Sequence, residues 1–172
     1  MASETDTARW RLEPFCQGNG LDIGFGGSPI KPSAICIDRP EGSPGRRHDE
    51  TPAPTHLIGP ADNLYWFKPN VLDYVYSSHV LEDFEDTAGV LREWLRVLKP
   101  GGHLVLFLPD QQTYIRETPR QHWNPDHKHA GFGLVWLKEI LIRIGIPQSA
   151  VVHEMFPVPG NAYSFDLVIK KP

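Results

Sequence analysis

GLDIGFGGSP, residues 20–29, is the stretch of this 172-residue chain that decides the fold. A short apolar strand runs into Asp22 and then into a glycine-rich turn at residues 24–27. Glycines at this spacing let the chain turn with positive φ and let a ligand lie against bare backbone. A dinucleotide-binding turn has a third glycine where Pro29 stands here. The turn therefore lacks a pyrophosphate cradle, which argues against a nicotinamide-dependent oxidoreductase.

A second acidic residue closes the next predicted strand. Residues 34–37 are apolar, and Asp38 follows them. An acid at the carboxyl end of the second strand of a Rossmann-like unit accepts hydrogen bonds from ribose hydroxyls. The chain thus keeps the residue that binds a ribose and lacks the turn that holds phosphates. A nucleoside cofactor with a positive centre and no phosphate fits this pattern, and S-adenosylmethionine (SAM) is such a molecule.

Four segments together resemble one known family, the class I SAM-dependent methyltransferases. They are GLDIGFGG (20–27), AICIDRP (34–40), LDYVYSSHVLEDFED (72–86) and LREWLRVLKPGGHLVLFLPD (91–110). The resemblance extends over roughly residues 20–170. It implies a Rossmann-like α/β fold, in which a mostly parallel sheet ends in a late antiparallel hairpin. It also implies SAM as the cofactor and a methyl acceptor as the substrate.

The chain divides into an N-terminal segment, residues 1–19, and one methyltransferase-like domain, residues 20–172. In the segment, Trp10, Leu12 and Phe15 can make at most a short docking element. In the domain we expect strands at 20–23, 34–37, 56–58, 74–77, 103–108, 150–156 and 164–170, and helices at 87–98 and 134–144. Asp86 is the expected N-cap of the first helix, and Gly145 the stop of the second.

The early crossovers of this sheet are short. Ten residues, two of them proline, separate the first two strands, so the usual first helix is reduced to a turn. Residues 39–55 and 109–132 are expected to be irregular loops. One face of the sheet is therefore thinly covered, although parallel sheets are ordinarily buried on both faces. We expect the N-terminal segment, the long loop or a second subunit of a homodimer to cover it.

The resemblance assigns cofactor contacts to residues at the carboxyl edge of the sheet. They are Asp22, Gly24, Phe25, Gly26, Asp38, Arg39, Ala61, Asp62 and Ser78. Simpler roles stay open for several of them: Asp22 and Asp62 can cap turns, and Asp38 can face water or pair with Arg39. Leu64 and Trp66 suit either an adenine contact or the core.

Histidines are the candidates for catalysis. His79 ends the fourth predicted strand, while His127 and His129 belong to the segment HWNPDHKH, residues 122–129. A histidine near a methyl acceptor can act as a general base or line the pocket, and it can also be a hydrogen-bonded wall residue. His122, Asp126, His127 and His129 have metal-ligand chemistry, but no second ligand cluster follows, so we predict no metal.

Composition narrows the remaining functions. A net charge of −4 and scattered basic residues argue against nucleic acid as a partner. Cys16 and Cys36 are expected to be free thiols, and no signal peptide or membrane span is visible, so we expect a cytoplasmic protein. The sequence predicts a SAM-dependent methyltransferase with a small-molecule or saccharide acceptor. The alternative is an inactive methyltransferase fold that serves as a binding or scaffold domain.

Overall fold

The computed structural model describes residues 3–38 and 57–172. These residues form one sheet with the strand order β3-β2-β1-β4-β5-β7-β6. Only β7 runs antiparallel to its neighbours, which confirms the predicted parallel sheet with a late hairpin. The strands are β1 (Gly20–Ile23), β2 (Ile35–Asp38), β3 (Leu57–Ile58), β4 (Leu72–Ser78), β5 (Leu98–Pro109), β6 (Val151–Met155) and β7 (Ser164–Lys170).

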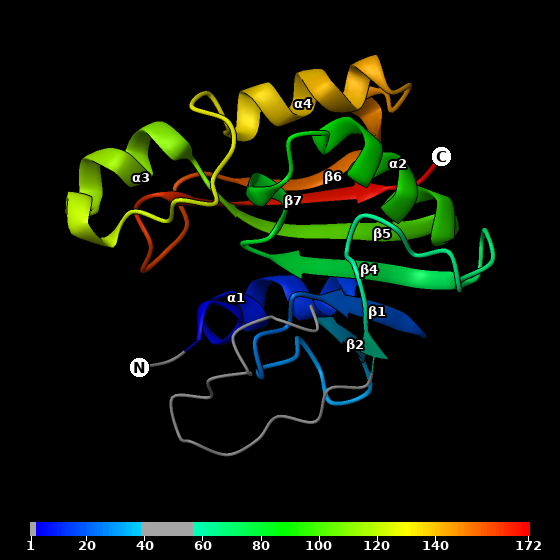
Figure 1. Cartoon of the computed structure of the whole chain (residues 1–172). Helices are drawn as coiled ribbons and strands as arrows, with labels where there is room; N and C mark the ends of the chain where they lie inside the picture. The colour runs from blue at the N-terminus through cyan, green and yellow to red at the C-terminus, as the bar shows by residue number, and fades with distance from the viewer. Residues whose placement is uncertain (1–2, 39–56) are drawn as a thin grey trace.

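Helices cover both faces of this sheet. Helices α2 (Thr87–Val97) and α4 (Leu134–Arg143) lie on one face, and α1 (Glu4–Leu12) lies on the other (Figure 1). Helix α3 (Gln111–Glu117) lies beyond the end of the sheet at which β4 and β5 finish (Figure 1). The space around the carboxyl ends of the strands is therefore bordered by α1 and α3.

Helices α2 and α4 form where the sequence places them, for the expected reasons. The Asp86 side chain accepts a hydrogen bond from the Gly89 amide at 2.8 Å and so caps α2. Gly145, at φ 92°, ends the last turn of α4. The inward faces of the two helices join the larger core cluster on this side of the sheet. Their buried side chains include Val90, Leu91, Trp94, Leu95, Leu137 and Leu141.

The N-terminal segment is more ordered than predicted. Ser3 and Asp6 form a capping box that starts α1, whose nine residues exceed the expected short docking element. Ala8 and Leu12 are fully buried against Tyr76 and Phe107 of the sheet, whereas Trp10 is 69% exposed. The N-terminal segment therefore packs on the sheet face that the sequence predicted to be thinly covered. It is one of the three covers that we expected. Residues 24–34 contain no helix, which confirms the shortened first crossover.

Two element predictions need correction. The region 109–132 is not a plain loop, since α3 begins after Asp110, whose carboxylate caps the Thr113 amide at 3.0 Å. Burial of Gln111 and Tyr114 stabilises this short helix, and a polar sequence does not reveal such burial. Strand β5 also begins earlier than predicted, at Leu98, because its first residue still pairs with Leu72 of β4. Residues 39–55, including Arg39, lie outside the described residues.

Candidate functional site

The carboxyl ends of β1, β2 and β4 meet at one edge of the sheet. Ile23 is in register with Ile37 on one side and with Ser77 on the other. The turn that follows β1 is tied to β2, because the Gly24 amide donates to the Ile37 carbonyl at 2.9 Å. In open α/β sheets this edge is the place where ligands bind.

The glycine turn is packed at one position and open at another. Gly24 has φ 70°, and a Cβ there would lie 2.2 Å from Cγ2 of Val80, so only glycine fits. Gly26 has φ 54° and is exposed, and a Cβ there would meet only the Gly24 carbonyl, at 4.0 Å. Phe25, between them, is buried in the core cluster on the α1 face. The turn therefore offers its backbone to a ligand at Gly26.

Asp22 is buried, and one of its two carboxyl oxygens accepts a hydrogen bond. Its Oδ2 accepts a hydrogen bond from the Ile30 amide at 2.6 Å, which is the turn-capping role that the sequence left open. Its Oδ1 is buried and has no hydrogen-bond partner among the described residues. Burial raises the pKa of Asp22 to about 7, while the Ile30 amide and Arg9 oppose that shift. The free oxygen makes this site suited to a ligand with a hydrogen-bond donor or a positive charge.

The remaining predicted cofactor residues lie along the same edge. Asp38 ends β2 and is partly exposed, and Ser78 is buried at the end of β4. Asp62 is exposed after β3, and the Ala61 carbonyl accepts the Trp94 indole N–H at 2.7 Å. Leu64 is fully buried in the core cluster, and Trp66 packs against that cluster. For these two side chains the core role is confirmed.

His79 stands at the centre of a second group of polar side chains. It follows β4 with a left-handed φ of 51°, which a non-glycine residue seldom adopts. Its Nε2 lies 3.1 Å from the Ser164 hydroxyl, and its ring meets Phe107 edge-on at 5.1 Å between centroids. Burial lowers the pKa of His79 to about 3, so the ring is neutral at physiological pH.

Glu82 joins His79 to His127. The Glu82 side chain is 1% exposed, and its Oε1 lies 3.5 Å from His79 Nδ1 and 3.8 Å from His127 Nε2. Its Oε2 is buried without a hydrogen-bond partner among the described residues. Burial raises the pKa of Glu82 well above its usual value, with Asp83 and Glu4 adding to the shift. Glu82 was not predicted as a site residue, because an acid in a short polar segment gives no signal of burial.

The two predicted loop histidines have different surroundings. His127 Nδ1 lies 2.6 Å from Oε1 of Gln111, and its ring packs on Tyr114 at 4.9 Å. Burial lowers the pKa of His127, and His79 acts in the same direction. His129 does not join this group, because its Nε2 contacts the Phe84 and Glu85 carbonyls at 3.1 Å and its ring packs on Trp136. The structure thus gives His129 a loop-anchoring position, and the prediction that it is catalytic gains no support.

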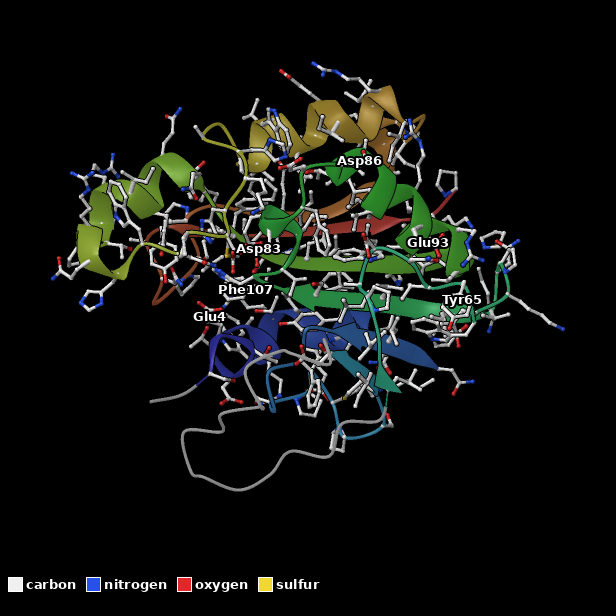
Figure 2. All side chains as sticks on the ribbon, in the orientation of Figure 1. Glu4, Tyr65, Asp83, Asp86, Glu93 and Phe107 are labelled. Carbon is white, nitrogen blue, oxygen red and sulfur yellow. The ribbon has the colours of Figure 1, made fainter. Side chains whose placement is uncertain are left out.

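Helix α1 adds one further acid to the group. Oε1 of Glu4 lies 3.7 Å from His79 Nδ1, and 48% of the Glu4 side chain is exposed. Figure 2 shows Glu4, Asp83 and Phe107 at the same end of the sheet. The site is therefore built from α1, the end of β4 and the loop before α4. No group of three His, Cys, Asp or Glu side chains among residues 3–38 and 57–172 is arranged to hold a metal ion.

A glycine turn open at Gly26, an unpaired Asp22 oxygen and Asp38 at the next strand end fit a nucleoside with a positive centre. The strand order, with β7 antiparallel to both of its neighbours, is that of a class I methyltransferase fold. The methyltransferase domain family matches residues 21–106, which is half of the chain. The chain belongs to the methyltransferase domain family and is a SAM-dependent methyltransferase. Its cofactor is SAM.

Solved structures show the same fold at low sequence identity. A SAM-dependent methyltransferase from Archaeoglobus fulgidus superposes with a TM-score of 0.70 at 17% identity, over 98% of this chain and 95% of that one. A Thermotoga maritima SAM-dependent methyltransferase, described as a possible histamine N-methyltransferase, gives a TM-score of 0.67 at 18% identity, over 99% of this chain and 88% of that one.

A third structure contains the cofactor. It is phosphoethanolamine N-methyltransferase 2 of Haemonchus contortus in complex with SAM, and it gives a TM-score of 0.65 at 15% identity, over 95% of this chain and 52% of that one. No curated protein sequence matches the chain. No helix among the described residues is long and apolar enough to cross a membrane.

Proposed function

We propose that this enzyme methylates a small-molecule or saccharide acceptor bound beside His79 and His127. The observation that carries the proposal is the position of these two histidines on either side of one Glu82 oxygen, at the sheet edge that also carries the glycine turn. A buried cluster of titratable groups beside a ligand-binding edge is typical of active sites. The T. maritima protein named above is described as a possible histamine N-methyltransferase and the H. contortus protein as phosphoethanolamine N-methyltransferase 2, and acceptors of these names are compatible with this size.

The residues proposed to hold the cofactor are those at the ends of β1 and β2. Gly26 offers open backbone, Asp22 offers one carboxylate oxygen, and Asp38 is suited to the ribose hydroxyls. When bound, SAM supplies a methyl carbon on a positively charged sulfur, which keeps the carbon–sulfur bonding electrons when the carbon moves to an acceptor lone pair. The chain's own task is to hold the acceptor close and dry and to remove its proton.

His127 is the better general base of the two. Burial lowers the pKa of His79 to about 3, which leaves that imidazole a weak base, and it lowers the pKa of His127 less. A proton on the His127 ring creates a positive charge 3.8 Å from Glu82, and this charge favours ionisation of the Glu82 carboxyl. Glu82 thus stabilises the protonated base. His79, which is held by Ser164, would line the pocket.

Two measurements test this function. Isothermal titration with SAM and S-adenosylhomocysteine (SAH) measures cofactor binding, and release of SAH measures methyl transfer to a panel of amines, alcohols and sugars. His127→Ala should lower turnover by about 10²- to 10⁴-fold and leave cofactor affinity unchanged. The matched control is His122→Ala, an exposed residue of the same loop.

The outcomes separate an enzyme from a scaffold. Binding of SAH with turnover of any acceptor supports the enzyme, whereas no heat with either cofactor form supports the scaffold alternative. One observation favours the scaffold alternative. Val80 packs against Gly24 and leaves less space beside the glycine turn at that residue. Turnover equal to wild type in His127→Ala would exclude His127 as the base.

A further inference from the structure

One carboxylate of the histidine cluster is open to a ligand. Glu4 reaches the cluster from the first turn of α1, where it lies 3.7 Å from His79, and about half of its side chain is exposed. The helix holds it there, since the Thr5 hydroxyl meets the Tyr76 hydroxyl at 3.3 Å and Arg11 binds Asp166. Glu4 is therefore an acid fixed at the mouth of the site.

Among the described residues, Glu4 forms no ion pair with a lysine or an arginine. Within the described chain, the ion-pair partners of Glu4 and Glu82 are histidines. Both histidines have a lowered pKa, mainly because they are buried, so neither brings a positive charge at neutral pH. The Glu4 carboxylate is therefore available to pair with a cation from a ligand.

Glu82 gives a second and independent indication that the site binds a ligand with a hydrogen-bond donor. Its side chain is 1% exposed, and its Oε2 has no hydrogen-bond partner among the described residues. An unpaired buried carboxyl oxygen is costly, and a donor from a ligand would remove that cost. The unpaired Glu82 oxygen is thus suited to a ligand that donates a hydrogen bond.

Aromatic rings line the same site. Tyr163 meets the His79 ring at 6.3 Å and the Tyr114 ring at 5.2 Å. Aromatic faces attract organic cations, and the attraction grows when water is excluded. Carboxylate and aromatic groups together are the usual surroundings of a bound ammonium group.

We propose that the methyl acceptor of this enzyme is a small amine, carried as a cation, and that the Glu4 carboxylate binds it. The inference rests on the proposed function and specifies the substrate class of the same site. The ammonium group must lose one proton before its nitrogen has a lone pair for the methyl carbon. His127 takes that proton as the general base, and the product leaves as the methylated ammonium cation.

The surroundings of Glu4 make its ionisation sensitive to a bound cation. Burial among its neighbours raises the pKa of Glu4 to about 7, and His127 opposes the shift. The titratable groups that face it are His79 after β4, Glu82 on the following turn, His127 on the loop before α4 and Tyr163 before β7. An ammonium group beside Glu4 favours its ionised form, which is the form that binds the cation.

The test compares amines with alcohols of the same skeleton. Ethanolamine and ethylene glycol, benzylamine and benzyl alcohol, and tyramine and tyrosol are each incubated with SAM, and SAH release is measured. We expect turnover of at least one amine and of no matched alcohol. Glu4→Gln should raise the KM for that amine by about 10- to 100-fold and leave SAH affinity unchanged. Glu139→Gln, an equal charge change on the exposed side of α4, should alter neither.

The possible results distinguish a failure of the amine inference from a failure of the proposed function. An unchanged amine KM in Glu4→Gln, or turnover of alcohols alone, overturns the amine inference. Binding of SAH without turnover of any amine in the set also counts against it. A failure to bind SAM and SAH would instead contradict the proposed function. Thermal melting of Glu4→Gln, compared with wild type, checks that α1 keeps its place.

Discussion

Arg11 and Asp166 lie 155 residues apart in the chain and form a buried ion pair. Nε of Arg11 is 2.7 Å from Oδ2 of Asp166, and the two side chains are 2% and 0% exposed. The guanidinium group also lies over the Phe107 ring. This pair fixes α1 to β7, so the position of Glu4 depends on the C-terminal strand.

Loss of one partner of this pair should destabilise the protein strongly. Arg11→Ala leaves the Asp166 charge buried without its partner, and we expect a loss of about 3 to 5 kcal/mol of unfolding free energy. Urea denaturation measures it, and Arg143→Ala on exposed α4 should change stability by less than about 0.5 kcal/mol. Replacing both partners together, Arg11→Met with Asp166→Leu, should restore most of the loss. A single variant as stable as wild type would show that α1 is held by other contacts.

Asp22 should make the cofactor-free protein less stable as the pH rises. The folded protein keeps the Asp22 proton up to a pKa of about 7, while the unfolded chain releases it near its ordinary value of 3.8. Because the folded state binds more protons in this interval, stability falls as the pH rises from about 4 to 7. Asp22→Asn keeps an acceptor for Ile30 and cannot ionise. We expect it to be more stable than wild type by roughly 2 to 4 kcal/mol at pH 8 and nearly equal below about pH 3.5.

The measurement is thermal unfolding of both proteins at several pH values without cofactor. A difference that is independent of pH would show that Asp22 keeps an ordinary pKa in the folded protein. The same variant should bind SAM more weakly if Oδ1 of Asp22 contacts the cofactor.

Asp38 should contribute to cofactor affinity. Removal of a carboxylate that binds ribose hydroxyls is expected to weaken SAM binding by roughly 1 to 3 kcal/mol, about 5- to 150-fold in Kd. Titration calorimetry of Asp38→Ala measures this change. Asp126→Ala, an exposed acid in the loop before α4, serves as the control with equal charge. Equal affinities of the two variants would remove Asp38 from the cofactor site.

The glycine turn should tolerate a side chain at one position and not at the other. Gly24→Ala places a methyl group 2.2 Å from Val80 at φ 70°, and we expect a loss of roughly 2 kcal/mol or more. Gly26→Ala also has a left-handed φ, but it meets open space, so its loss of stability should be smaller, roughly 1 kcal/mol. If Gly26 faces the cofactor, Gly26→Ala should reduce SAM affinity more than it reduces stability. Unfolding and binding measured on the same samples compare the two effects.

Local patterns account for what could be predicted of the fold. The apolar spacing of α2, its Asp86 cap and the glycine after α4 act within a few residues, so they can be read from the sequence. The same holds for the turn after β1 and for the acid that ends β2. Helix α3 was missed because its stability comes from burial of Gln111 and Tyr114, which is a tertiary effect.

The amino-acid sequence by itself determined the order of the strands, helices α2 and α4 and the family, since neighbouring residues encode strands, caps and turns. Only the tertiary structure decided that Glu4 and Glu82 join His79 and His127, and that His129 anchors a loop instead. The physical reason is distance along the chain: these side chains come from segments that meet only when α1, the end of β4 and the loop before α4 pack around the same buried carboxyl group.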